Sequence, residues 1–203
     1  MRVFLISASP RQNSITSRFT QYLESVFLQI NPEVQTTRID FDTFDFPAIG
    51  KGNVGPENLS PFQSQLVEGW RNADLIVLCS PEYNWTANGE VFIMLDRIGS
   101  RKFQDLFEEK VFAFCGVSSG RGGRQPALDM QKVLGKVVSF LGGISIVSSK
   151  ILEAHDTEKN LNETGFSNGN QVFERSAEDF ARYSFSLADR WRAGKGHLSK
   201  LHE

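Results

Sequence analysis

The sequence has few cysteines and no long hydrophobic run. Its 203 residues include two cysteines, Cys79 and Cys115, each at or near the end of an apolar run, where a small hydrophobic residue is common. This scarcity excludes a disulfide-rich scaffold and favours a reducing, cytoplasmic setting. No apolar stretch approaches the roughly 20 residues of a membrane-spanning helix, and Ser9-Pro10-Arg11 cuts the first stretch too short for a signal peptide. We therefore expect a soluble cytoplasmic protein with no membrane partner.

An excess of charge of either sign is also lacking. Lysine and arginine number 22 against 24 aspartates and glutamates, which gives a formal net charge of −2. So nearly neutral a chain offers no field for nucleic acid or an anionic membrane, and we expect neither as a partner. The three histidines, His155, His197 and His202, have no metal-ligand spacing, and the two cysteines lie too far apart for a zinc pattern. No metal site is expected.

Apolar runs alternate along the chain with segments of helical period. Apolar runs predict strands at residues 3–6, 75–78, 110–115 and 144–147, and a return to β-branched residues predicts another at residues 34–41. The periodic segments predict helices at residues 16–28, 61–72, 90–98, 125–141 and 172–191. Right-handed crossovers that cover both faces of a five-stranded parallel sheet commonly give the strand order 2-1-3-4-5. The sequence therefore predicts an α/β fold, a doubly wound three-layer sandwich.

One domain accounts for this pattern. The length of the chain suits a single domain, which we expect at residues 1–193. Within it, the polar segment at residues 153–169 is expected to be a loop. Residues 194–203 are expected to form a mobile tail.

Three polar loops directly follow apolar runs. They are Ser9-Pro10-Arg11-Gln12-Asn13-Ser14, Ser80-Pro81-Glu82-Tyr83-Asn84 and Gly116-Val117-Ser118-Ser119-Gly120-Arg121-Gly122-Gly123. In an open parallel sheet, ligands bind beyond the carboxyl ends of the strands. We therefore expect the three loops to converge on one edge of the sheet, and the function to lie there.

The first loop has the character of a phosphate site. Hydroxyls and one arginine cluster where the first strand turns into the first helix: Ser9, Arg11, Ser14, Thr16 and Ser17. Unpaired N–H groups and the positive end of the helix dipole attract an anion there. The glycine patterns of a dinucleotide fingerprint, a Walker loop and a serine-hydrolase elbow are absent. The alternative is that Ser14 merely caps the helix and that Arg11 is a solvated surface charge.

The other two loops suit a planar ligand. Pro81-Glu82-Tyr83-Asn84 offers a rigid turn with an aromatic ring and an amide. Ser118-Ser119-Gly120 places small residues where a backbone can approach the other edge of that ligand. The alternative for each is an ordinary turn or a flexible loop.

Taken together, the loops resemble a known family. Ala8-Ser9-Pro10-Arg11-Gln12-Asn13-Ser14 is similar to the Gly-Ser-x-Arg-x-x-Ser phosphate loop of the flavodoxin-like NADPH-dependent FMN reductases. Pro81-Glu82-Tyr83-Asn84 is like their Pro-Glu-Tyr-Asn signature, and Ser118-Ser119-Gly120-Arg121-Gly122-Gly123 is similar to their third flavin loop. The resemblance runs from about Arg2 to Leu152 and implies a flavodoxin-like fold.

The resemblance implies an oxidoreductase that binds FMN and takes a hydride from NADPH or NADH. Electrons would leave to a small acceptor such as a quinone, an azo compound, a metal oxyanion or another flavin. No side-chain acid or base is implied, because the reaction takes place at flavin N5. The implied cofactor-binding residues are Ser9, Arg11, Ser14, Thr16 and Ser17 for the phosphate, Pro81, Glu82, Tyr83 and Asn84 along one border of the ring, and Ser118, Ser119 and Gly120 on its pyrimidine side.

One segment departs from the family pattern. After Gly89 the family commonly continues Leu-Lys-Asn, whereas this chain has Val91-Phe92-Ile93. The departure falls on the region implied to form the nicotinamide face, the acceptor pocket and the subunit interface. Family members resemble homodimers or homotetramers, and the same assembly is expected here.

Three other functions compete with this one. Cys115 and Arg121 satisfy the Cys-x5-Arg pattern of cysteine-dependent phosphatases, although Gly122-Gly123 and Pro126 indicate a helix that starts too late for that mechanism. A flavodoxin-type electron carrier would bind FMN without oxidising NAD(P)H, but such carriers resemble strongly acidic proteins. The third alternative is a family relative that has lost its flavin.

Overall fold

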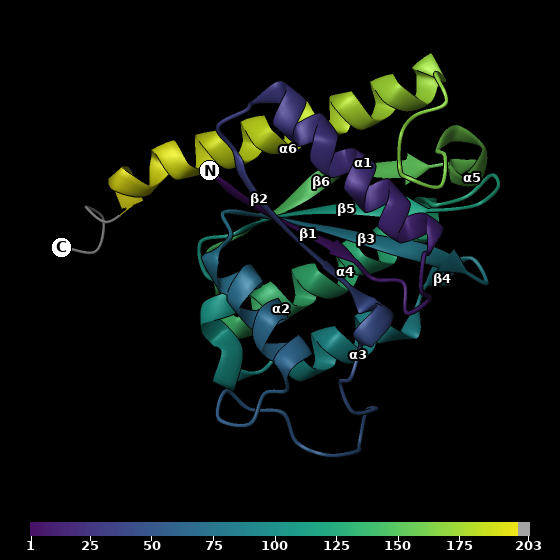
Figure 1. Cartoon of the computed structure of the whole chain (residues 1–203). Coiled ribbons are helices and arrows are strands. Elements are labelled where there is room, and N and C mark those ends of the chain that lie inside the picture. Colours follow the sequence, from purple (N-terminus) through teal and green to yellow (C-terminus); the bar gives the residue numbers. More distant parts are fainter. Residues whose placement is uncertain (199–203) are drawn as a thin grey trace.

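Five parallel strands form the central sheet of the protein (Figure 1). The computed structural model describes residues 1–198, and these strands are β1 (Arg2–Ser7), β2 (Gln35–Asp40), β3 (Leu75–Tyr83), β5 (Val111–Val117) and β6 (Ile146–Ala154). They lie in the order β2-β1-β3-β5-β6, and every neighbouring pair is parallel. A short strand, β4 (Thr86–Ala87), pairs antiparallel with the end of β3. Numbered among the parallel strands alone, the order is the predicted 2-1-3-4-5.

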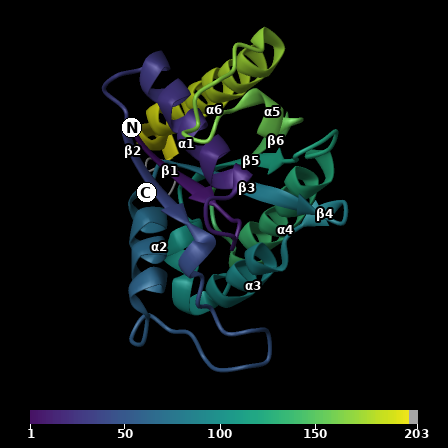
Figure 2. The same ribbon diagram turned by 45° about the vertical axis from the view of Figure 1, so that its right-hand side comes forward.

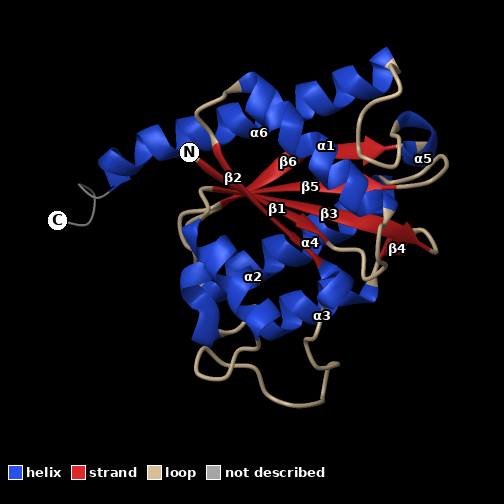
Figure 3. Cartoon of the chain, viewed as in Figure 1, coloured by secondary structure: helices blue, strands red, loops and turns tan. Residues whose placement is uncertain are grey.

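Helices cover both faces of the sheet (Figure 1, Figure 3). On one face lie α1 (Ile15–Ile30) and α6 (Gln171–Leu198); on the other lie α2 (Pro61–Asn72), α3 (Gly89–Ile98) and α4 (Arg124–Leu141). The described chain also has the one-turn helix α5 (Thr157–Asn160) and two 3-10 segments, Phe41–Thr43 and Arg101–Phe107. The predicted doubly wound sandwich is therefore confirmed.

Helices bury both faces of the sheet, and successive side chains of a strand point to opposite faces, so each strand contributes to two cores. In β1, Val3 and Leu5 belong to the core under α1 and α6, whereas Phe4 and Ile6 belong to the core on the other face. Trp70 of α2 is fully buried in that second core, and its Nε1–H donates to the carbonyl of Leu106 at 2.8 Å. Two-sided burial explains why β1, β3 and β5 contain continuous apolar runs in the sequence.

The last strand and the loop after it differ from their predictions. The sequence predicts a strand at residues 144–147 and a loop at 153–169, but β6 runs from Ile146 to Ala154, and α5 lies inside the expected loop. An edge strand has one neighbour only and tolerates polar side chains. Because β6 is at the edge of the sheet, it can contain Ser149 and Lys150, and these polar residues end the apolar run from which the strand was predicted.

The second polar loop is mostly strand. β3 continues past the predicted residues 75–78 as far as Tyr83, because the chain turns back at once as β4. Glu82 pairs with Ala87 and Tyr83 with Thr86 across this hairpin. Backbone pairing therefore fixes a segment that the sequence presents as a turn.

The carboxyl-terminal segment is helical where it is described. The tail expected at residues 194–203 overlaps α6, which continues to Leu198. Residues 199–203 lie outside the described residues. Among residues 1–198, none of the helices has the length and apolar character needed to cross a membrane. In the same residues, no group of three or more His, Cys, Asp or Glu side chains is arranged to hold a metal ion.

Candidate functional site

The three polar loops meet at one cavity of about 640 Å³ beyond the carboxyl ends of β1, β3 and β5. Figure 2, in which this edge comes forward, shows the start of α1 and the β4 hairpin on the same side of the molecule. Nine of the twelve expected site residues line the cavity: Ser9, Arg11, Ser14, Thr16, Pro81, Glu82, Tyr83, Asn84 and Ser119. The predicted convergence of the loops on one sheet edge is therefore confirmed.

The first loop ends in a capped helix N-terminus. Ser14 is the N-cap of α1, and its Oγ accepts a hydrogen bond from the N–H of Ser17 at 3.0 Å. Asn13, just before the cap, has φ of 53°, in the left-handed region. The first turn of α1 carries no acidic side chain. The remaining N–H groups of this turn and the helix dipole therefore favour an anion in the cavity.

Ser9 and Arg11 place polar groups against the ring of Tyr83. Ser9 is 2% exposed, and its Oγ lies 3.5 Å from the hydroxyl of Tyr83 and 3.4 Å from the N–H of Arg11, from which it accepts. The guanidinium of Arg11 lies 4.8 Å from the centre of the Tyr83 ring, within the range of a cation–π contact. The aromatic ring of the second loop therefore lies directly beside the polar groups of the first.

Arg18 is a second cation at the cavity and was not expected from the sequence. It follows the N-cap Ser14 by four residues, which places the two on the same face of α1. That spacing is the signal that would have identified it. The other lining residues absent from the expected set are Gln12, Asn13, Ile15 and Val117.

The hairpin that carries the second loop is fixed to α4. Asn84 and Trp85 form its turn with φ of 48° and 62°, a conformation that costs energy for residues other than glycine. Thr86 Oγ1 donates to a carboxylate oxygen of Asp129 at 2.6 Å. Trp85 is 79% exposed at the tip. The hairpin therefore projects from the sheet edge with both of its strands anchored.

The third loop depends on close backbone packing between Gly116 and Gly123. A Cβ on Gly116 would lie 1.7 Å from the carbonyl oxygen of Gly123, and Gly123 itself has φ of 93°. The N–H of Gly123 donates to Glu82 Oε2 at 2.8 Å, so the third loop is tied to the second. The N–H of Gly122 donates to Nδ1 of His155 at 3.1 Å. His155, although exposed, therefore helps to hold the third loop.

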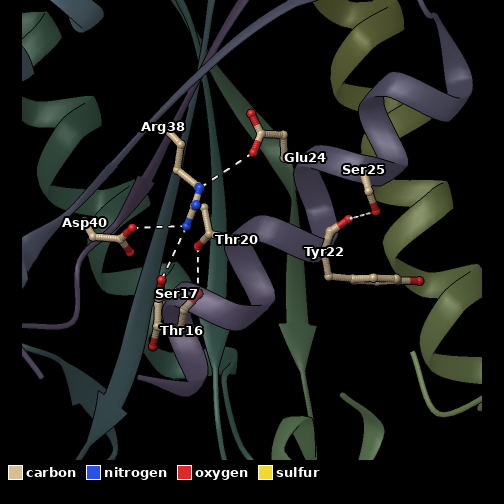
Figure 4. A network of polar contacts seen from close by, with 8 residues as sticks. All are labelled: Thr16, Ser17, Thr20, Tyr22, Glu24, Ser25, Arg38 and Asp40. Carbon is tan, nitrogen blue, oxygen red and sulfur yellow. Dashed lines mark hydrogen bonds and ion pairs between the residues drawn. The ribbon is translucent and has the colours of Figure 1, made fainter. Parts of the chain in front are cut away.

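Three expected residues do not line the cavity: Ser17, Ser118 and Gly120. Ser17 Oγ instead accepts from Arg38 Nη1 at 3.4 Å, and Arg38 also pairs with Glu24 and Asp40 (Figure 4). Ser118 is bonded through its backbone to Ala154 and Thr157. A Cβ at Gly120 would meet no protein atom within 4 Å. Within the third loop, the positions at which neighbouring backbone leaves no room for a Cβ are therefore Gly116 and Gly123.

The geometry around Cys115 does not fit the phosphatase alternative. Cys115 is fully buried in β5, directly opposite Cys79 of β3. Burial, together with the contact with Cys79, raises the pKa of the Cys115 thiol well above its usual value, so it stays protonated. Helix α4 begins at Arg124 rather than at Arg121. The thiolate and the adjacent helix N-terminus that this mechanism needs are both lacking.

Comparisons with known proteins agree with this geometry. A family model described as NADPH-dependent FMN reductase matches residues 1–155. A search of curated proteins found no match. Among solved structures, FerB, a flavoenzyme NAD(P)H:(acceptor) oxidoreductase from Paracoccus denitrificans, is 14% identical with a TM-score of 0.63 over 95% of this chain and 97% of that one.

Two further structures show the same fold. An oxidoreductase from Corynebacterium diphtheriae is 13% identical with a TM-score of 0.62 over 93% of this chain and 97% of that one. The apo form of the NADH:FMN oxidoreductase EMOB is 19% identical with a TM-score of 0.55 over 95% of this chain and 89% of that one. The family itself rests on the model match over residues 1–155, which include all three loops. The chain therefore belongs to the NADPH-dependent FMN reductase family, a family of oxidoreductase enzymes that use FMN and NAD(P)H.

Proposed function

We propose that this chain holds FMN in the cavity formed by its three loops and uses it to pass electrons from NAD(P)H to a small acceptor. The observation that carries the proposal is the convergence of an anion-attracting helix start, an aromatic hairpin and a glycine-supported loop on one cavity of about 640 Å³. Ligand cavities of roughly 300–1,000 Å³ are typical of small-molecule and cofactor sites. Family membership supports the same cofactor.

The residues present fit the two ends of FMN. At the phosphate end, Ser9, Ser14 and the first N–H groups of α1 supply hydrogen-bond partners, and Arg11 and Arg18 supply positive charge. At the ring end, the cavity is lined by Pro81, Tyr83 and Ser119, which offer flat or small surfaces. A charged end and a planar end in one cavity match a flavin that carries a phosphate.

Bound FMN supplies the redox chemistry, because it accepts a hydride from NAD(P)H and returns electrons to the acceptor. The chain would hold and orient the cofactor and supply backbone N–H donors where the reduced ring gains negative charge. The Glu82 carboxylate, which accepts from Gly123 N–H, keeps the second and third loops in register for this task. None of the cavity-lining residues is required as a proton donor or acceptor at flavin N5.

The acceptor belongs, in our proposal, to the small planar or oxyanionic compounds: a quinone, an azo compound, a metal oxyanion or another flavin. Two structural neighbours support a small acceptor, since one is an NAD(P)H:(acceptor) oxidoreductase and the other, an NADH:FMN oxidoreductase, supports a flavin. We also propose that the chain works as a homodimer or homotetramer in the cytoplasm. Size-exclusion chromatography with light scattering would test the assembly, and a monomer at working concentration would contradict it.

An absorbance spectrum recorded before and after anaerobic addition of NADPH or NADH tests the function. The protein, purified or mixed with FMN, should show bound-flavin absorbance that bleaches when the nicotinamide is added. Flavin absorbance that does not bleach would instead support an electron carrier. A protein that neither contains nor takes up FMN would refute the proposal.

A further inference from the structure

Asn88 occupies a helix-capping position but does not cap. It directly precedes α3, where asparagine is among the preferred N-cap residues. Its side chain makes no cap hydrogen bond to α3. Instead it is turned into the protein, and the residue is only 1% exposed. A polar side chain that gives up its local hydrogen bond and is buried must be satisfied elsewhere.

The side chain of Asn88 joins two loops that are far apart in the sequence. Its Nδ2 donates to the carbonyl of Ala8 at 2.7 Å, and its Oδ1 accepts from the Oγ of Ser80 at 2.9 Å. Ala8 immediately precedes the first loop of the cavity, and Ser80 immediately precedes Pro81 of the second. The N–H of Asn88 also donates to Ser80 Oγ at 3.3 Å. One buried amide therefore links the phosphate end of the cavity with the ring end.

An amide is the group that this position requires. The second hydrogen on Nδ2 goes to Glu90 Oε2 at 2.7 Å, so both partners of Nδ2 are acceptors while Oδ1 faces a hydroxyl donor. Asparagine supplies two donors and an acceptor in one plane. An aspartate would direct a carboxylate oxygen at the Ala8 carbonyl and at Glu90. An apolar residue would leave the buried Ser80 hydroxyl with one partner fewer.

We propose that Asn88, together with Ser80, is a positioning residue that fixes the separation between the first loop, at the phosphate end of the cavity, and the second loop, at its ring end. This spacing allows FMN to be bound at both ends. The proposal rests on the proposed FMN site. Asn88 does not line the cavity and is not expected to touch the cofactor. The N–H of Ala8 already donates to the carbonyl of Cys79 at 2.8 Å, and Asn88 adds the side-chain link that carries this spacing on to Ser9 and Pro81.

Fixed spacing matters only to a ligand that uses both ends of the cavity. When one end of FMN is bound, the rigid link places the other subsite where the second end already is, and this preorganisation strengthens the binding of the whole molecule. Riboflavin has the same ring but no phosphate. Its affinity should therefore depend much less on the spacing of the two loops. The ratio of FMN affinity to riboflavin affinity measures the contribution of Asn88 separately from general stability.

The test compares FMN and riboflavin binding by flavin fluorescence in the full chain and in Asn88→Ala and Asn88→Asp. We expect FMN affinity to fall about tenfold in Asn88→Ala and further in Asn88→Asp, while riboflavin affinity changes by less than about twofold. Gln63→Ala is the matched control. Gln63 is also a buried amide: its Oε1 accepts from the N–H of Ser60 at 3.3 Å and its Nε2 donates to Asp45 Oδ1 at 3.1 Å, and it does not line the cavity. Gln63→Ala should lower stability and leave the affinity ratio unchanged.

Several outcomes would overturn the inference. FMN and riboflavin affinities that fall together, or an unchanged ratio, would show that Asn88 acts only on the fold. If neither Asn88 variant folds, Ser80→Ala removes the hydroxyl partner while leaving the bond to Ala8, and the affinity ratio must then fall in that variant, although less steeply. A wild-type chain that binds no FMN would refute the proposed function and this inference with it. That result is obtained before any variant is made, so the two failures are distinguishable.

Discussion

Gly122→Ala is predicted to break the tie between the second and third loops. A Cβ at position 122 would lie 1.7 Å from Glu82 Oε2 and 2.7 Å from its Cδ, distances that real Cβ atoms do not show. The obstacle is the end of a flexible side chain rather than backbone, so Glu82 must swing away and release the N–H of Gly123, 2.8 Å distant in the wild type. The Oγ of Ser118, 2.9 Å from the same Cβ, must also shift slightly. The main effect of the substitution is therefore the local removal of one charged hydrogen bond.

The size of the effect follows from that bond. A hydrogen bond to a charged group contributes about 1.5–3 kcal/mol to the free energy of unfolding. Replacing glycine by alanine raises that free energy by about 0.4–1 kcal/mol, because the unfolded chain loses conformational entropy. The free energy of unfolding should therefore fall by about 1–2 kcal/mol. With a urea m-value of roughly 2 kcal/mol/M, the midpoint of unfolding should fall by about 0.5–1 M.

Gly120→Ala is the matched control in the same loop. A Cβ at Gly120 would meet no protein atom within 4 Å, so the free energy of unfolding of this variant should not fall and should rise by up to about 1 kcal/mol. Equal midpoints for the two variants would refute the reasoning. A second check introduces Gly122→Ala into the Glu82→Ala variant, which already lacks the hydrogen bond from the N–H of Gly123. In that background Gly122→Ala should lower the free energy of unfolding very little. Additive losses would show that Glu82 is not the cause.

Three further outcomes are expected. Arg11→Ala should strongly weaken FMN binding and leave the unfolding midpoint almost unchanged, because Arg11 is an exposed cation at the cavity. Unchanged FMN affinity would show that Arg11 does not belong to the site. Burial, with smaller contributions from Glu174 and Glu178, raises the pKa of Tyr22 to about 12. The unfolded chain then loses this proton first, near pH 10, so the stability that Tyr22 provides is complete below pH 10 and is lost between pH 10 and 12. Urea unfolding should therefore show a steeper loss over that interval in the wild type than in Tyr22→Phe, and identical pH profiles would contradict the assignment. Cys79 and Cys115 are fully buried, so neither should react with a thiol reagent such as iodoacetamide until the protein is unfolded; rapid labelling of the native protein, followed by mass spectrometry, would show that the strands open at this point.

Much of the candidate site could be predicted because its residues belong to short contiguous segments. Ser9, Arg11 and Ser14 lie within one turn, and the geometry of a strand followed by a helix brings them together locally. Two of the residues that prediction missed act through distant partners. Asn88 bonds to Ala8, and His155 bonds to Gly122. A single sequence contains no signal that pairs such positions, because each has an ordinary local role as a helix cap or a loop residue.

The sequence by itself determined the order of the strands, the two-sided burial of the sheet and the edge at which the loops gather. These follow from local periodicity and from the handedness of crossovers, which depend on neighbouring residues and not on the details of packing. Only the tertiary structure decided that the second loop is a paired hairpin, that β6 continues to Ala154, and that Ser17 turns to Arg38 instead of to the cavity. In each case the deciding energy is a hydrogen bond or ion pair with a partner on another segment, and the folded chain alone brings that partner within reach.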